Sequence, residues 1–181
     1  RLIICGRRKE VLDNLQIQLS NFTDVYSLVF DVRNQQEVQN AINSLPEEWK
    51  NIDVLVNNAG NAHGLEPISD ANISDWDAMM DGNVKGLLYV SQPIIKLMKA
   101  NNSGHIVNIS SVAARQTYAN GTVYCASKKA VDVISEGMRL ELTEFGIKVT
   151  NVQPGAVETD FSKVRFKGDE ERAATVYAGY E

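Results

Sequence analysis

The chain has 181 residues, of which 44% are hydrophobic and 23% are charged, and these values are ordinary for a single globular domain. Its net charge of −5, from 18 Lys and Arg against 23 Asp and Glu, argues against a nucleic-acid partner, because surfaces that bind nucleic acids are usually basic. The two cysteines and two histidines stand too far apart for a disulfide framework or a metal site, and no apolar run approaches the ~18 residues of a membrane helix.

Short apolar runs rich in Val and Ile recur along the chain, at 2–5, 25–30, 52–57, 105–110 and 147–152. They are continuous rather than alternating, which is typical of strands buried on both faces of a parallel sheet. Stretches with helical periodicity separate them, and these cover 8–19, 34–45, 74–100 and 122–145. The alternation predicts one α/β domain over 1–181, a Rossmann-like doubly wound parallel sheet in three α/β/α layers, with ligands at the carboxyl ends of the strands.

Two arginines, Arg7 and Arg8, follow the first apolar run, and no acidic residue occurs before Glu10. Dinucleotide folds that prefer NAD usually place an acid here for the ribose 2′-hydroxyl, whereas an arginine accommodates the 2′-phosphate of NADP. Guanidinium groups bind phosphate oxygens with paired hydrogen bonds. Arginines that open a helix can also be merely solvated, but position and charge together favour binding of NADP(H).

Other strand ends carry weaker signals. Asp31 either caps the next helix or meets the adenine amino group, and Gly60 lets backbone approach a ligand closely, although a simple turn explains it equally well. Pro154 and Gly155 after the last run are ordinary turn residues that would also line the cofactor end of the sheet.

Tyr124 and Lys128 are four residues apart in a predicted helix and therefore share a face. A tyrosine with its ordinary pKa near 10 is a poor base at neutral pH, and lowering this pKa by about three units requires roughly 4 kcal/mol. A nearby ammonium can supply an energy of that size at an effective dielectric constant of about 20. Ser111, at the end of the preceding strand, would donate a hydrogen bond to the substrate oxygen.

Asn83 lies inside a predicted helix, where asparagine is unfavourable. Its amide is either exposed to solvent or bonded locally, or it marks a bent helix whose freed carbonyl holds a water that passes protons to Lys128.

These motifs resemble the short-chain dehydrogenase/reductase family, through "NNAG" (57–60), "NVKG" (83–86), "IVNISS" (106–111), "YCASK" (124–128) and "PGAVETDF" (154–161). The resemblance implies a catalytic tetrad of Asn83, Ser111, Tyr124 and Lys128, with Ser111 preferred over Ser110 because it stands thirteen residues before Tyr124. Tyr124 and Lys128 would also contact the cofactor. The resemblance implies further cofactor contacts from Arg7, Arg8, Asp31, Val32, Asn58, Ala59, Gly60, Pro154, Gly155, Ala156, Val157 and Thr159.

Within the family, "EEWKNIDVLVNNAG" and "FSKVRFKGDEE" (161–171) are most similar to the NADP-dependent 3-hydroxy acid dehydrogenases. That group implies a homotetramer that oxidises serine, allo-threonine and related β-hydroxy acids and reduces malonic semialdehyde. A cytoplasmic location is expected separately, because neither a membrane span nor a signal peptide is visible in the sequence. The alternatives are a 3-oxoacyl-carrier-protein reductase or general carbonyl reductase, and a protein that binds NADP(H) without turnover. Arg115, Arg165 and Lys167 are the cations near the expected pocket mouth, and Arg115 or Arg165 is the candidate for binding a substrate carboxylate.

One family element is not found in the sequence: a first strand followed by a glycine-rich "TGxxxGxG" loop. The family's last strand and helices are also not found. A Rossmann order places that first strand at the centre of the sheet, so runs 2–5 and 52–57 would flank a gap with unpaired backbone on both sides. We therefore expect 1–181 to be a partial domain that does not fold or bind cofactor normally in isolation.

Overall fold

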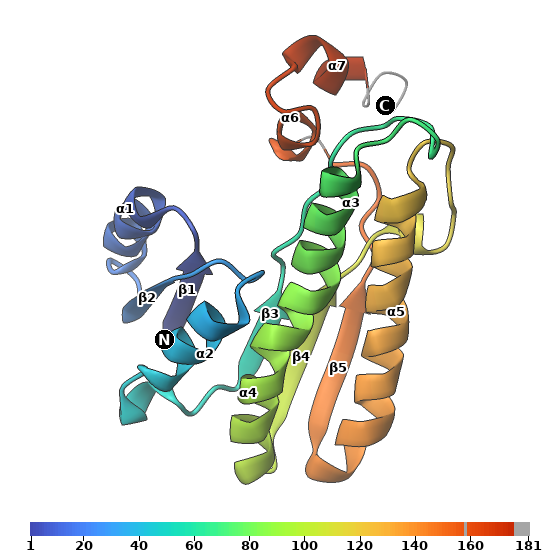
Figure 1. The fold of residues 1–181 in the computed structure, drawn as a ribbon. Coiled ribbons are helices and arrows are strands. Elements are labelled where there is room, and N and C mark those ends of the chain that lie inside the picture. The colour runs from blue at the N-terminus through green and yellow to red at the C-terminus, as the bar shows by residue number, and fades with distance from the viewer. Residues whose placement is uncertain (158, 176–181) are drawn as a thin grey trace.

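A computed structural model describes residues 1–157 and 159–175, and it shows parallel strands flanked by helices (Figure 1). The first half of the chain alternates strands and helices as expected. Its elements are β1 (Leu2–Gly6), α1 (Lys9–Leu19), β2 (Val25–Val29), α2 (Gln35–Asn43), the 3-10 turn η1 (Glu47–Trp49) and β3 (Val54–Asn57).

The second half of the chain carries the longer helices. Its elements are α3 (Ile73–Met80), the π-helical turn η2 (Asp81–Lys85), α4 (Gly86–Ala100), β4 (Gly104–Ile109), the 3-10 turn η3 (Val112–Ala114), α5 (Thr122–Leu142), the 3-10 turn η4 (Thr143–Phe145), β5 (Ile147–Val152), α6 (Phe161–Arg165) and α7 (Glu170–Thr175). The helix predicted over 74–100 is thus interrupted by η2. Gly146 ends the α5–η4 helix with the left-handed φ of 67° that favours glycine at this position.

The strands form two parallel sheets, one of order β1-β2 and one of order β3-β4-β5. Within the described residues no strand pairs with the free edges of β1 and β3, which are the two runs expected to flank a gap. Val54 and Val56 of β3 are accordingly 53% and 56% exposed, although their residue type is typical of a buried strand. The order of the strands is therefore Rossmann-like, but the single continuous sheet is replaced by two.

The main core lies between β3-β4-β5 and the helices α4 and α5, which cover one face of that sheet (Figure 1). Its most buried side chains, Val38, Met98, Ile106 and Val131, come from three helices and the central strand β4. In the described part of the chain no helix is long and apolar enough to cross a membrane.

A buried polar network ties the strands to these helices. Asn57 Nδ2 donates to Ser91 Oγ of α4 at 2.9 Å and to Asn108 Oδ1 of β4 at 2.8 Å, and Asn108 Nδ2 donates to Ser135 Oγ of α5 at 2.9 Å. Buried polar groups that are satisfied in this way hold neighbouring elements in one arrangement. The network fixes α5 against the strands whose carboxyl ends carry the candidate site.

Candidate active site

The beginning of α5 brings the predicted tyrosine and lysine together. Tyr124 is 8% exposed and Lys128 is 6% exposed, and Lys128 Nζ lies 6.0 Å from the centre of the Tyr124 ring. Ser111 is the second residue after β4, and its hydroxyl is a hydrogen-bond partner of the Tyr124 phenol. The hydroxyl, the phenol and the amine therefore meet at the carboxyl end of β4, as the sequence predicts.

Lys128 is held in a partly desolvated position. Its Nζ donates to the carbonyl oxygen of Ile109, the last residue of β4, at 3.0 Å. Burial lowers the pKa of Lys128 from an ordinary 10.5 to about 8, because a charged ammonium is costly to remove from water.

Asn83 lies in the π-helical turn η2 and is 2% exposed, so its amide is not directed to solvent. Its Oδ1 accepts from Asn61 N at 2.7 Å, and its Nδ2 donates to Asn61 O at 2.8 Å and to Ser127 Oγ at 2.9 Å. A Cβ added at Gly60 would stand 3.2 Å from Asn83 Oδ1 and 3.3 Å from Lys128 Nζ. The disrupted helix therefore brings Asn83 to the lysine, across a glycine that leaves room for both.

Burial raises the pKa of Tyr124, whereas the hydrogen bond from Ser111 and the charge of Arg165 lower it. The net direction is opposite to the lowering that base catalysis needs. The physical reason is that a buried phenolate loses its hydration.

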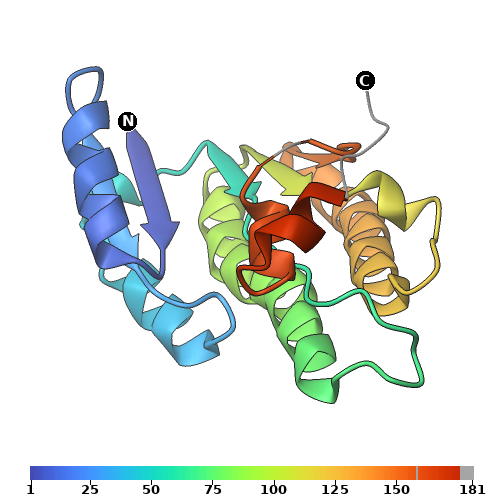
Figure 2. The same cartoon turned by 90° about the horizontal axis from the view of Figure 1, so that it is seen from above.

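A pocket that opens to solvent adjoins Tyr124. Figure 2 shows α6 and α7 above the carboxyl ends of the strands, and α6 contributes Arg165 to the pocket wall. The wall consists of residues from the loop after β3, from α3, from the start of α5 and from α6: His63, Gly64, Glu66, Ile68, Ala71, Asn72, Asp75, Trp76, Met79, Asn120, Gly121, Thr122, Val123, Tyr124 and Arg165.

Of the three predicted cations, the structure places only Arg165 in this pocket. Arg165 is 6% exposed, its Nε donates to Gly64 O at 2.9 Å, and its guanidinium carbon lies 5.7 Å from the centre of the Tyr124 ring. Arg115 is exposed and does not line the pocket, and Lys167 is paired with Asp75 at 2.9 Å. The structure therefore favours Arg165 over Arg115 as the carboxylate ligand.

The predicted cofactor residues lie along the carboxyl ends of the strands. Arg7 and Arg8 are exposed after β1, and Val32 contacts the position where a Cβ of Gly86 would stand. Asn58, Ala59 and Gly60 are exposed after β3, and Pro154, after β5, accepts a hydrogen bond from Val112 N at 3.0 Å. Gly155, Ala156, Val157 and Thr159 are also exposed, on either side of a residue that lies outside the described part of the chain.

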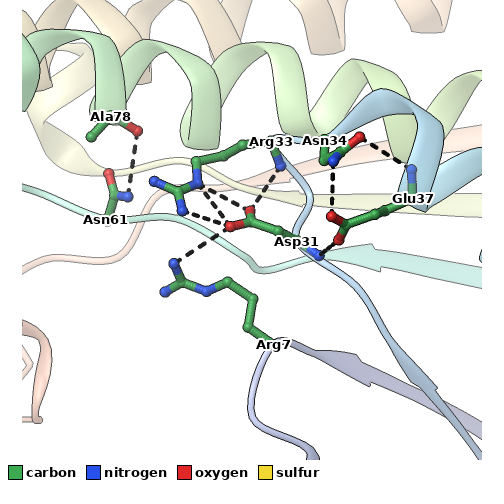
Figure 3. A network of polar contacts seen from close by, with 7 residues as sticks. All are labelled: Arg7, Asp31, Arg33, Asn34, Glu37, Asn61 and Ala78. Carbon is green, nitrogen blue, oxygen red and sulfur yellow. Dashed lines mark hydrogen bonds and ion pairs between the residues drawn. The ribbon is translucent and has the colours of Figure 1, made fainter.

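Asp31 lies close to two arginines at the carboxyl ends of the strands. Its carboxylate accepts from Arg33 Nη2 at 2.6 Å and lies 3.8 Å from Arg7 Nη1, in a network drawn in Figure 3. The guanidinium of Arg33 is the main reason why the pKa of Asp31 lies below its usual range. Exposed arginines that can donate to phosphate oxygens, and a glycine that allows close approach of a ligand, fit a phosphorylated dinucleotide such as NADP(H).

Sequence reasoning missed several residues that shape the site. Ser127 Oγ donates to Tyr124 O at 2.7 Å, and Ser110 Oγ donates to Lys128 O at 2.9 Å, so both serines brace the turn of α5 that carries the reactive pair. His63 lines the pocket, and burial lowers its pKa. Short polar residues inside apolar runs were the available signal for the serines, but Ser110 is 18 residues from its partner Lys128, and Ser127 is 44 residues from Asn83, which donates to it.

Comparison with known proteins identifies the family. The short chain dehydrogenase family model matches residues 1–170. The NADP-dependent 3-hydroxy acid dehydrogenase YdfG of Escherichia coli O6:H1 is 44% identical over 178 residues, which are 98% of this chain and 71% of that protein. A protein of the same description from Schizosaccharomyces pombe is 36% identical, over 100% of this chain and 71% of its own length.

Solved structures agree with the sequence relatives. The closed form of a serine dehydrogenase in complex with NADP+ superposes with a TM-score of 0.95 at 42% identity, over 100% of this chain and 73% of that one. A serine dehydrogenase from Escherichia coli superposes with a TM-score of 0.84 at 38% identity, over 98% of this chain and 78% of that one. The chain therefore belongs to the short-chain dehydrogenase family and is an NADP-dependent oxidoreductase that acts on CH–OH groups.

Proposed function

We propose that the chain carries out the dehydrogenation of small 3-hydroxy acids, of the serine, allo-threonine and malonic semialdehyde type, with NADP(H). The observation that carries this proposal is one pocket wall that holds both the phenol of Tyr124 and the buried guanidinium of Arg165. A phenol suits proton exchange with a hydroxyl, and a guanidinium suits a carboxylate two carbons away.

In the proposed reaction the substrate hydroxyl loses its proton to the Tyr124 phenolate, while the hydrogen on carbon C3 of the substrate leaves as hydride. NADP(H), when bound, would supply the nicotinamide for this reversible hydride transfer. Ser111 donates a hydrogen bond to the substrate oxygen. Burial raises the pKa of Tyr124, and the ammonium form of Lys128, together with the positive charge that oxidised nicotinamide would bring, would oppose this shift and favour the phenolate.

Asn83 has a positioning role in this proposal. Its hydrogen bonds to the backbone of Asn61 hold the loop after β3 beside the π-helical turn, and its Oδ1 and the Lys128 amine flank Gly60. The predicted proton path through a water in this region stays a prediction.

Exposed apolar side chains on the two long helices support the proposed homotetramer: Leu88 on α4 is 40% exposed, and Val133 and Leu140 on α5 are 58% and 80% exposed. Val133 and Leu140 are seven residues apart and therefore share one face of α5, which a second subunit would cover in such an assembly. The tetramer, the cytoplasmic location and the single-domain organisation stay predictions.

The role of Arg165 can be tested with a matched pair of alcohols, 3-hydroxypropionate and 1,3-propanediol, which differ at the carboxylate. Arg165→Ala should raise the KM for 3-hydroxypropionate at least about tenfold more than the KM for the diol, because only the acid loses an ionic partner. Arg165→Lys, which keeps the charge, should show a smaller difference and guards against a general loss of folding.

Arg115→Ala is the control, because Arg115 is an exposed arginine outside the pocket. It should leave both KM values within about twofold of the unmodified enzyme. If Arg165→Ala raises the two KM values equally, Arg165 does not bind the carboxylate.

A further inference from the structure

Arg7 and Arg33 approach the same carboxylate, and they do so unequally (Figure 3). Arg33 donates to Asp31 Oδ2 from Nη2 at 2.6 Å, and its Nε lies 3.0 Å from both carboxylate oxygens. Arg7 Nη1 remains 3.8 Å from Asp31 Oδ2, which is beyond hydrogen-bond distance. Arg33 therefore occupies the carboxylate, and the Arg7 side chain stays 61% exposed.

The local backbone explains why Arg33, and not Arg7, forms the hydrogen bonds with Asp31. Asn34 N donates to Asp31 O at 2.9 Å, and Arg33 N donates to Asp31 Oδ1 at 3.0 Å, so a tight turn places Arg33 beside the aspartate. Glu37 closes the turn from α2, since its carboxylate accepts from Asp31 N at 3.0 Å and from Asn34 Nδ2 at 2.8 Å. Arg7, by contrast, reaches Asp31 from a different strand.

The pairing of Arg33 with Asp31 changes the net charge at the place where a phosphate would bind. Arg33 holds the pKa of Asp31 below its usual range, so Asp31 is an anion at neutral pH. An unpaired Asp31 would repel a phosphate and would also attract the guanidinium of Arg7 away from it. Paired with Arg33, the carboxylate is neutralised and its oxygens are already occupied.

We propose that Arg33 is a positioning residue for cofactor selection: by holding Asp31 it leaves Arg7 free to bind the 2′-phosphate of NADP(H). Arg33 acts through Asp31 and Arg7 and does not itself contact the phosphate. The inference rests on the proposed role of Arg7 as the residue that binds the 2′-phosphate.

The test is a thermodynamic cycle read out by binding rather than by turnover. Dissociation constants of NADPH and NADH are measured by fluorescence titration for the whole enzyme and for Arg33→Ala, Asp31→Asn and the double variant. Arg33→Ala should weaken NADPH binding about fivefold and change NADH binding less than about twofold, a size suited to a partly exposed ion pair. In the Asp31→Asn background, where no anion competes for Arg7, Arg33→Ala should change NADPH binding less than about twofold.

Two further variants control for general charge effects. Lys9→Ala removes the same unit charge close to Arg7 and Arg8, but Lys9 pairs with Asp13 at 2.6 Å and not with Asp31. It should change NADPH binding less than about twofold. Arg33→Lys keeps the charge without the planar fork and should fall between the unmodified enzyme and Arg33→Ala.

The outcomes separate this inference from the proposal on which it rests. If Arg7→Ala leaves NADPH binding unchanged, the role of Arg7 fails and the role of Arg33 fails with it. If Arg7→Ala weakens NADPH binding but Arg33→Ala does not, only the role of Arg33 is overturned. The role of Arg33 is also overturned if Arg33→Ala weakens NADPH binding equally with Asp31 present and in the Asp31→Asn background. It is likewise overturned if Lys9→Ala weakens NADPH binding as much as Arg33→Ala does.

Discussion

The proposed catalytic end and the proposed cofactor end of the site differ in burial and in how their side chains are held. Tyr124, Lys128 and Asn83 are each less than 10% exposed and are held by hydrogen bonds from the turns and strand ends around them. The side chains of Arg7 and Arg33 are 61% and 40% exposed; Arg33 donates hydrogen bonds to the carboxylate of Asp31, whereas Arg7 is attracted to it by charge alone. Proton transfer depends on fixed geometry in a dry site, whereas recognition of a phosphate depends on charges that salt can screen.

The largest effect is expected at the buried end. Tyr124→Phe should lower kcat at least about a thousandfold, because it removes the proton-transfer group. The ring contacts with Phe161 and Arg165 remain, so NADPH binding should stay within about twofold. The measurement is steady-state oxidation of L-serine together with a binding titration.

Tyr118→Phe is the matched control, since the Tyr118 hydroxyl contacts Arg165 at 3.2 Å but belongs to a more exposed side chain. It should lower kcat less than about tenfold. A Tyr124→Phe enzyme that keeps a tenth or more of kcat would remove Tyr124 from the reaction.

A smaller effect follows from the buried amine. Burial lowers the pKa of Lys128 from 10.5 to about 8, so the folded protein loses this proton before the unfolded chain does as the pH rises through that interval. Below pH 8 the folded state therefore bears the full free-energy cost of burying the charged ammonium. This cost falls as the pH rises towards 10.5, because the buried amine is then neutral. Relative to Lys128→Met, the unmodified enzyme should gain about 3 kcal/mol in its free energy of unfolding across this window.

Denaturant titrations at pH 7 and pH 10 measure this gain. Lys129→Met changes the neighbouring lysine, whose side chain is 58% exposed, and should show no such pH dependence. A difference between Lys128→Met and the unmodified enzyme that is equal at both pH values would mean that Lys128 is not desolvated in the folded state.

The sequence predicted the buried end well. Strand runs, helical periodicity and the four-residue spacing of Tyr124 and Lys128 are local signals, and burial then turns them into fixed positions. A bent helix at Asn83 was expected only as one alternative, and its π-helical form was not predicted, because helical periodicity alone does not distinguish a π turn from a regular turn.

The exposed end was predicted less completely. Arg33 was not recognised, since an arginine in a polar segment carries no periodic signal and its contact arises from a turn between Asp31 and Asn34. The pairing of Asn57 with Asn108 was also beyond reach, because 51 residues separate the two partners. Arg115 and Arg165 were equal candidates until the position of α6 placed one of them in the pocket.

The central claim is that exposed arginines select the cofactor while a buried phenol and amine carry out the chemistry. Its most direct test is kcat/KM with NADP and with NAD, using L-serine, at low and at high ionic strength. We expect at least about a tenfold preference for NADP that shrinks markedly in high salt, while kcat at saturating NADP changes less than about twofold. Equal use of the two cofactors, or a preference that salt leaves unchanged, would contradict the account.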